Sequence, residues 1–183
     1  VDIGSHMTRL ALQVGLPVKS LVKQTIYGHF CGGESLEETI PTIERLAQSG
    51  VSTILDYGVE AKEDEDQFDR AVEEQLRAIR FADENPSVPY LSCKFTGYAS
   101  FSLLRSLHRD DDLSVEEAAA LGRLRNRLEQ ICDCAVQSDA AIYIDAEESW
   151  IQDGIDRLTE ELMARYNRTK PVVFNTIQLY RHD

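Results

Sequence analysis

The sequence predicts an α/β protein of the (β/α)8 TIM-type barrel class, of which its 183 residues supply about (βα)4β. Two observations lead to this prediction. Short apolar segments alternate with long amphipathic ones, which is typical of parallel strands joined by right-handed helical crossovers. Polar side chains follow the expected strands, and barrels of this class keep their active sites at the carboxyl ends of their strands. A full barrel typically needs about 250 residues, so the domain is expected to be C-terminally incomplete.

Five short segments are predicted to be strands, because they are apolar and rich in β-branched or aromatic residues. They are residues 21–27, 51–57, 90–95, 140–144 and 171–180. A doubly wound sheet is the other architecture that fits, and it would usually carry a glycine-rich phosphate loop after its first strand. HFCGGES at 29–35 has glycines but neither the GxGxxG nor the GxxxxGK[ST] spacing. The signal for that alternative is therefore weak.

Four main helices are predicted from apolar residues that recur at helical spacing. Ser35-x-x-Glu38 and Ser114-x-x-Glu117 are capping boxes that mark two helix starts. An acidic run at 63–66 suits the start of another helix, because it complements the helix dipole. The faces expected to be buried are Leu36, Ile40, Ile43 and Ala47; Phe68, Val72, Leu76 and Ile79; Leu121, Leu124, Leu128 and Ile131; and Ile151, Ile155, Leu158 and Leu162.

The composition is that of a soluble globular protein, with a formal net charge of −13 from 19 basic and 32 acidic residues. So acidic a chain is not expected to bind nucleic acid or anionic lipid nonspecifically. No apolar segment approaches the roughly 18 residues that span a membrane. Residues 1–7, VDIGSHM, are predicted to be a tag or a disordered leader, and 8–183 a single barrel domain.

Neither the cysteines nor the histidines predict a metal site. The four cysteines form no CxxC pair and are expected to be free, buried thiols in a reducing compartment such as the cytoplasm. The histidines show no HxH or HExxH spacing. No Ser-His-Asp or Cys-His catalytic set can be argued from spacing either.

Polar residues at the ends of the predicted strands form the candidate site. They are Asp56 and Glu60, then Lys94, then Asp145, then Gln178. A lysine at the mouth of a barrel can hold a substrate carboxylate, form a Schiff base, or pair with a neighbouring acid. Lys94 is expected to pair with Asp145 or Asp56, and such an ion pair is compatible with a catalytic role.

The other residues near these strand ends have two interpretations each. Asp145 carries a charge in a partly buried mouth and needs a partner. Glu147 and Glu148 either serve the mouth or begin the next helix. Gln178 carries both a donor and an acceptor, which suits the edge of a heterocycle such as a flavin pyrimidine, or it is a satisfied amide at the end of the sheet.

Four strings resemble motifs of the proline dehydrogenase family: ILDYGVE, KFTG, IDAEESW and FNTIQLY. They occur in order, with matching spacing, over nearly all of 16–183. The resemblance implies a distorted (β/α)8 barrel that holds FAD at the carboxyl ends of its strands. It also implies oxidation of L-proline to Δ1-pyrroline-5-carboxylate, with electrons passed to a membrane quinone. The protein would then be cytoplasmic, with peripheral association at the inner membrane.

The resemblance implies a role for five residues. Lys94 matches the lysine that contacts the substrate carboxylate, and Asp145 matches the aspartate that pairs with it beside the flavin, so both are expected to be catalytic. Glu60 matches an acid at the mouth that pairs with a substrate-binding arginine. Ala146 matches the residue whose backbone lies near the isoalloxazine, and Gln178 matches the glutamine that bonds the flavin ring.

The sequence departs from the family pattern, because the motifs of strands six to eight do not occur in it. These motifs bind more of the flavin and supply an Arg-Arg-x-x-Glu helix over the proline. Two alternatives therefore stay open. One is an aldolase-like barrel that uses Lys94 as a Schiff-base nucleophile. The other is an inactive half-barrel that associates with another copy or another chain through its open sheet edges.

Overall fold

The computed structural model describes residues 27, 31–58 and 64–182. The chain divides into two compact units, Val1–Arg45 and Leu46–Asp183. The strand predicted at 21–27 lies outside the described residues except for Tyr27, and the predicted leader at 1–7 lies wholly outside them.

Helix α4 runs from Leu36 to Gln48 and begins near the predicted capping box. The hydroxyl of Ser35 accepts from the backbone amide of Glu38 at 3.3 Å, as predicted. The Glu38 carboxylate, however, accepts from the backbone amide of Glu34, one residue before the expected donor. Only half of this capping box is therefore confirmed.

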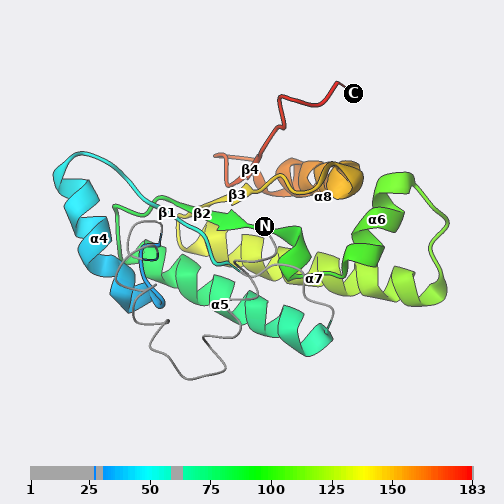
Figure 1. Ribbon diagram of the computed structural model, residues 1–183, viewed down its shortest axis with the longest axis horizontal. Helices are drawn as coiled ribbons and strands as arrows, with labels where there is room; N and C mark the ends of the chain where they lie inside the picture. Colours follow the sequence, from blue (N-terminus) through cyan, green and yellow to red (C-terminus); the bar gives the residue numbers. More distant parts are fainter. Residues whose placement is uncertain (1–26, 28–30, 59–63, 183) are drawn as a thin grey trace, which may run out of the picture. The chain divides into compact units, whose positions relative to one another are not determined.

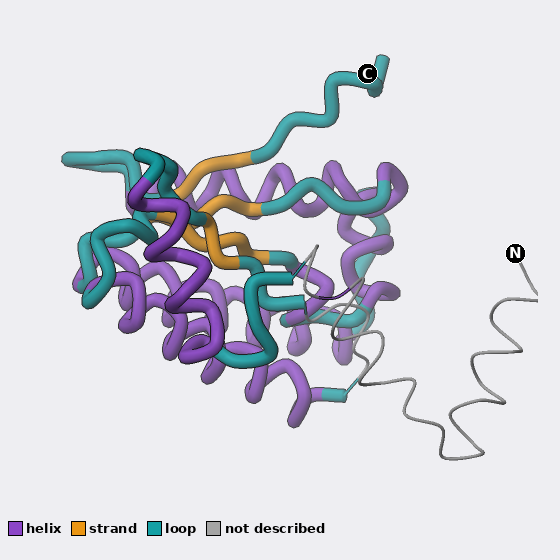
Figure 2. Tube along the Cα trace, turned by 60° about the vertical axis from the view of Figure 1, so that its left-hand side comes forward, coloured by secondary structure: helices purple, strands orange, loops and turns teal. Residues whose placement is uncertain are grey.

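The second unit contains a four-stranded parallel sheet with the order β1-β2-β3-β4 (Figure 1). Its strands are Ile54–Leu55, Tyr90–Cys93, Ala141–Ile144 and Val173–Asn175. A doubly wound sheet reverses its strand order at a switch point, and no reversal occurs here. Because the strands are parallel, the loops that follow them leave the sheet on one side, as Figure 2 shows.

The strand predicted at 171–180 is too long by several residues, because β4 ends at Asn175. The side chain of Asn175 accepts from the backbone amide of Thr176 at 2.9 Å, so this amide is used locally. The first strand of the sheet is also shorter than the predicted 51–57. By contrast, β2 and β3 lie within the predicted ranges.

The helices of this unit are α5 (Glu65–Asp83), α6 (Phe101–Arg109), α7 (Val115–Gln137) and α8 (Ser149–Tyr166), and a 3₁₀ turn, η2, spans Phe95–Gly97. The predicted capping box of Ser114 and Glu117 is complete at the start of α7. Helix α6 had no counterpart in the prediction. The hydroxyl of Ser100 begins it by accepting from the amide of Leu103 at 3.3 Å.

The two faces of the sheet differ in character. Leu91, Ile142 and Val173 stand in register across the sheet, and all three are fully buried. Helices α5, α7 and α8 contact β2, β3 and β4 respectively, and α7 also contacts both other helices. These helices therefore cover the face that carries the three aliphatic side chains, as the outer helices of a barrel do.

Aromatic side chains line the opposite face, which in a barrel is the inner one. The ring of Tyr143 stacks on Phe174 with 4.8 Å between centroids, and it meets Tyr90 edge-on at 5.1 Å. All three side chains are half-buried. Cross-strand aromatic pairs of this kind stabilise a sheet and help to fix its register.

A buried arginine joins α5 to α7. Arg127 keeps only 6% of its side chain exposed, donates to Asp69 at 2.8 Å and Glu65 at 2.5 Å, and lies over the ring of Phe68. It also donates to the carbonyl of Tyr98 at 3.1 Å, just after η2. The guanidinium is therefore paired on several sides, as a buried charge must be.

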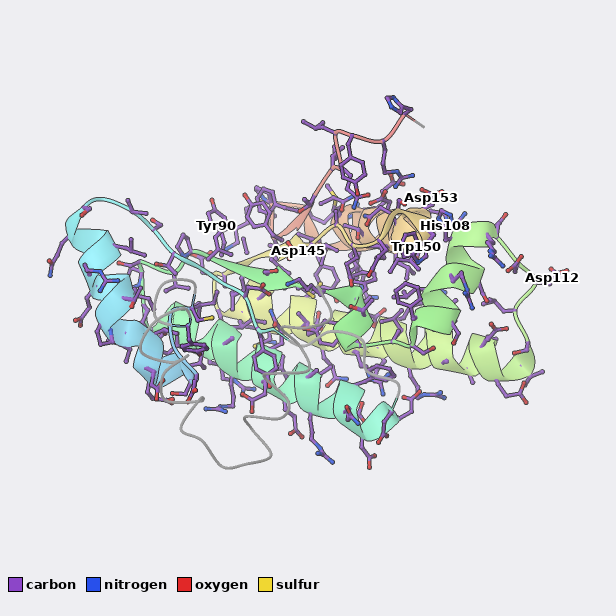
Figure 3. All side chains as sticks on the ribbon, in the orientation of Figure 1. Tyr90, His108, Asp112, Asp145, Trp150 and Asp153 are labelled. Atoms are coloured by element: carbon purple, nitrogen blue, oxygen red, sulfur yellow. The ribbon has the colours of Figure 1, made fainter. Side chains whose placement is uncertain are left out.

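Helices α6 and α8 approach most closely at Gly154. A Cβ atom at this position would lie 2.9 Å from Cβ of Leu107, 3.0 Å from the amide nitrogen of His108 and 3.1 Å from the carbonyl oxygen of Leu104. His108, Trp150 and Asp153 gather where the two helices meet (Figure 3). The small residue thus allows α6 to pack directly on α8.

Replacing Gly154 by alanine is expected to destabilise the protein by roughly 1–3 kcal/mol, because the new methyl group would push two backbones apart. Gly122→Ala in α7 is the matched control, since a Cβ there meets nothing within 4 Å. That change should be neutral or stabilising by up to about 1 kcal/mol, as alanine favours a helix. Urea unfolding of both variants measures the difference. Equal free energies of unfolding would contradict this packing.

Candidate functional site

Lys94 follows β2 directly and is held between two carboxylates. Its ammonium group lies 2.7 Å from Oδ2 of Asp56 and 3.6 Å from Oδ2 of Asp145. Only 18% of the lysine side chain is exposed. The expected pairing with an acid is therefore present, with the shorter contact to Asp56.

Asp145 directly follows β3, at the opposite end of the strands from Tyr90, as the labels in Figure 3 indicate. Its backbone amide donates to the carbonyl of Cys93 at 3.0 Å, so the ladder between β2 and β3 continues to this residue. Its carboxylate accepts from the hydroxyl of Ser92 at 2.8 Å. Side chains alternate along a strand, so Ser92 and Lys94 share the inner face. Ser92 was not a predicted site residue, although this alternation could have identified it.

The two glutamates after Asp145 behave differently. Glu148 occupies the cap position of α8, but its side chain makes no capping hydrogen bond. The Glu147 carboxylate instead accepts from the backbone amide of Thr96, at 3.1 Å, and from its hydroxyl. Burial raises the pKa of Glu147 above its usual range, although the bonds from Thr96 oppose that shift.

Gln178 lies three residues beyond the end of β4 rather than within a strand. Its Nε2 donates to the carbonyl oxygen of Glu147. Its Oε1 is buried and has no hydrogen-bond partner in the described part of the chain. One N–H of this amide is therefore used within the protein, and its buried oxygen lacks a partner among the described residues.

An open cleft of about 390 Å³ adjoins the carboxyl ends of β2 and β3. It is lined by Lys94, Ala146, Glu147, Glu148, Ser149, Trp150 and Tyr180. A second cleft, of about 470 Å³, contains Gln178 together with Arg181 and residues of α8. Lys94 and Ala146 therefore line the same cleft. Gln178 lies in the other cleft, and its side chain is hydrogen-bonded to Glu147, which lines the first one. Glu60, the remaining predicted site residue, lies outside the described residues.

This arrangement suits the binding of an anion better than nucleophilic attack. A Schiff base forms only from an unprotonated amine, and two carboxylates beside Lys94 favour the ammonium form. An ammonium group can exchange one of these partners for the carboxylate of a substrate. The geometry therefore favours Lys94 as a binding group.

Potential metal ligands and cysteine thiols are both present in residues 27, 31–58 and 64–182, and their arrangement can be compared with the predictions. No cluster of three or more potential metal-ligating side chains occurs there. Burial raises the pKa of Cys93, and it raises that of Cys132 to about 12, so both stay as thiols. All four cysteines are free, but Cys31 is exposed and Cys134 half-buried, so the expectation that all are buried is wrong.

The sequence model of the proline dehydrogenase family matches residues 39–183. The chain belongs to the proline dehydrogenase family. It is 34% identical over 154 residues to the carbapenem antibiotics biosynthesis protein CarD of Pectobacterium carotovorum subsp. carotovorum, covering 84% of this chain and 41% of that protein. It is 26% identical over 218 residues to mitochondrial proline dehydrogenase 1 of Dictyostelium discoideum, covering 98% and 38%.

A solved relative confirms the barrel class. Proline utilization A (PutA) from Bdellovibrio bacteriovorus, in a form inactivated by N-propargylglycine, superposes with a TM-score of 0.73 at 16% sequence identity. The match covers all of this chain and 20% of that one. The four described strands are thus part of a (β/α)8 barrel, and they do not close it. The chain spans about two-fifths of the curated relatives named above.

Glu147→Gln is expected to gain stability over the native chain as the pH rises above 4.5, the usual carboxyl value. Because burial raises the pKa of Glu147 in the folded state, its stabilising contribution is complete below the unfolded pKa. That contribution is lost as the pH rises through the folded pKa, whereas glutamine stays neutral. Thermal unfolding of both proteins between about pH 4 and pH 8 measures the trend.

Glu148→Gln, at the exposed neighbouring position, is the matched control and should show a much smaller trend. A stability difference between Glu147→Gln and the native chain that stays constant with pH would contradict the raised pKa. So would a difference that favours the native chain increasingly as the pH rises.

Proposed function

We propose that this chain forms the part of a proline dehydrogenase that holds the substrate carboxylate and one edge of FAD. Its reaction is the oxidation of L-proline to Δ1-pyrroline-5-carboxylate in proline catabolism. Membership of the proline dehydrogenase family, through residues 39–183, carries this proposal. The grouping of Asp56, Lys94 and Asp145 supports it, because proline brings a carboxylate that an ammonium group can bind.

Lys94 is the proposed binding group for the proline carboxylate, and Asp145 and Asp56 are the groups that orient it. The contact with Asp145, at 3.6 Å, is the looser of the two, so it can lengthen at little cost when a substrate anion approaches. The hydroxyl of Ser92 keeps the Asp145 carboxylate in place meanwhile. The predicted role of Glu60 in pairing with a substrate-binding arginine stays a prediction.

The residues near the cleft fit FAD. A flavin pyrimidine offers one ring N–H donor, and the unpartnered Oε1 of Gln178 is a matching acceptor. Ala146 lines the cleft beside Lys94 with a small side chain, which leaves its backbone accessible to a planar ring. When bound, FAD supplies the acceptor for the electrons and hydrogen removed from proline. We also propose a quinone as the final electron acceptor. The protein would be cytoplasmic and would reach the quinone by peripheral association with the inner membrane.

No helix in the described ranges is both long and apolar enough to cross a membrane. Association with another copy through open sheet edges also stays a proposal. Sedimentation velocity on the purified chain tests it, and a monomer at all concentrations would contradict it.

One relative supports a second candidate function, in biosynthesis. The Pectobacterium protein, 34% identical to this chain, is named for carbapenem antibiotic biosynthesis rather than for proline breakdown. The same site could then oxidise a five-membered cyclic amino acid during synthesis. Flavin reduction rates with L-proline and with ring-substituted prolines separate the two, since a synthetic enzyme should prefer a substituted ring by tenfold or more, about 1.4 kcal/mol.

The binding roles are tested by exchanging one group at a time in the flavin-loaded protein. Lys94→Met should weaken proline binding by about tenfold to a hundredfold, the value of a charge-assisted hydrogen bond, and leave FAD affinity unchanged. Gln178→Leu should weaken FAD binding more than it weakens proline binding. Anaerobic bleaching of flavin absorbance by proline reports both the substrate and the cofactor.

Two exposed positions provide matched controls. Lys170→Met removes a surface ammonium group, and Gln130→Leu removes a surface amide. Neither should change proline or FAD binding. A protein that takes up no FAD would rule out the proposed function for this chain. A Lys94→Met variant as sensitive to proline as Lys170→Met would rule out the role of Lys94.

A further inference from the structure

Glu147 joins three separate segments of the second unit. Its carboxylate accepts hydrogen bonds from the amide and the hydroxyl of Thr96, in η2. Its backbone amide donates to Oε1 of Gln152, in α8, at 2.8 Å. Its carbonyl oxygen accepts from Nε2 of Gln178, after β4. One residue therefore ties together the turn after β2, the first turns of α8 and the segment after β4.

These bonds reach both groups assigned to ligands above. Thr96 lies two residues after Lys94, so the carboxylate of Glu147 fixes the turn that carries the lysine. The carbonyl of the same residue fixes the amide of Gln178. The lysine and the glutamine belong to different clefts. Glu147 is hydrogen-bonded to the segments that carry both side chains.

The surroundings of Glu147 keep this link rigid. Gln152 is 1% exposed, and its Nε2 donates to Asp156 at 2.9 Å, so both ends of its amide are used. Asn175, the last residue of β4, donates to the same carboxylate oxygen of Asp156 at 2.9 Å. The turn after β3 is thus anchored to α8, and α8 is anchored to β4.

A purely structural role does not require an acid at this position. A half-buried carboxylate is costly to desolvate, and burial raises the pKa of Glu147. A neutral side chain could bond the amide of Thr96 at lower cost. A half-buried carboxylate whose two oxygens meet both donors of Thr96 is the pattern expected where function constrains a residue.

We propose that Glu147 is a positioning residue that sets the separation between the Lys94 ammonium group and the Gln178 amide. This inference rests on the proposed function, in which the first group holds the proline carboxylate and the second holds the flavin. Glu147 acts through Thr96 and Gln178. Removing its carboxylate therefore affects substrate and cofactor together.

The first experiment needs no ligand and uses the purified chain. Glu147→Ala should speed hydrogen exchange at the backbone amide of Thr96 by at least tenfold, because its acceptor is lost. The side-chain amide resonances of Gln178 should shift as the turn relaxes. Glu147→Gln keeps an oxygen acceptor and should restore most of the protection. Glu148→Ala, beside it on the cleft, should change neither signal.

The second experiment measures affinities and the flavin reduction potential in the loaded protein. Glu147→Ala should weaken FAD and proline binding together, each by about tenfold, and should shift the potential. Lys94→Met should affect proline alone, and Gln178→Leu chiefly FAD. A role confined to folding would lower the melting temperature and leave the two affinities and the potential as they are in the native protein.

The outcomes distinguish a failure of the positioning role of Glu147 from a failure of the proposed function. Exchange at Thr96 and resonances of Gln178 that match the Glu148→Ala control would overturn the positioning role, and so would unchanged affinities. If the native chain binds neither FAD nor proline, the proposed function fails, and the exchange experiment alone decides whether Glu147 couples the two segments. Should Glu147→Ala not fold, Thr96→Val removes the hydroxyl that donates to Glu147, and the Gln178 resonances and the two affinities then serve as the readouts.

Discussion

The ion pair of Lys94 with Asp56 and Asp145 depends on the register of the parallel sheet. These residues follow three adjacent strands, and because the strands are parallel their carboxyl ends lie together. Successive side chains alternate between the faces of a sheet, so a slip of one residue in β2 would turn Lys94 toward the helices. A lysine 18% exposed would then be buried among aliphatic side chains without a carboxylate. The register of the sheet therefore sets the position of Lys94, and the need to pair its charge disfavours a shifted register.

Behind the sheet, a chain of polar contacts supports this register. Arg127 donates to the carbonyl of Tyr98, whose hydroxyl lies 3.3 Å from Oε1 of Gln75. The amide nitrogen of Gln75 donates to the carbonyl of Ser92 at 3.1 Å, and the hydroxyl of Ser92 donates to Asp145. Polar groups of α5, α7 and the turn after β2 are thus hydrogen-bonded in a series that ends at Ser92 and Asp145, beside Lys94. Such networks specify one arrangement of a core when every member is paired.

The sequence was sufficient to predict the barrel class and the positions of β2 and β3. It also predicted that Lys94 pairs with an acid, because a charged residue follows each of these two apolar segments. It was misleading after β4, where the apolar pattern continues although Asn175 takes up the next amide. Helix α6 was missed because nine residues give only about two and a half turns of periodicity. Gln75 and Ser92 were missed for another reason. Each is a polar residue in an apolar pattern. Strand alternation places Ser92 on the face of Lys94, but only the folded chain shows the hydrogen-bond partners of the two residues.

Lys94 is held by two carboxylates, and we propose that it is a charged group that receives the carboxylate of proline. NMR of the lysine ammonium groups, with the Lys94 signal assigned from its loss in Lys94→Met, tests this most directly. Lys94 should give the signal of a protonated, hydrogen-bonded amine that shifts as L-proline is added, while the signal of Lys170 stays in place. A neutral amine at position 94, or a Lys94 signal that proline leaves unchanged, would contradict it.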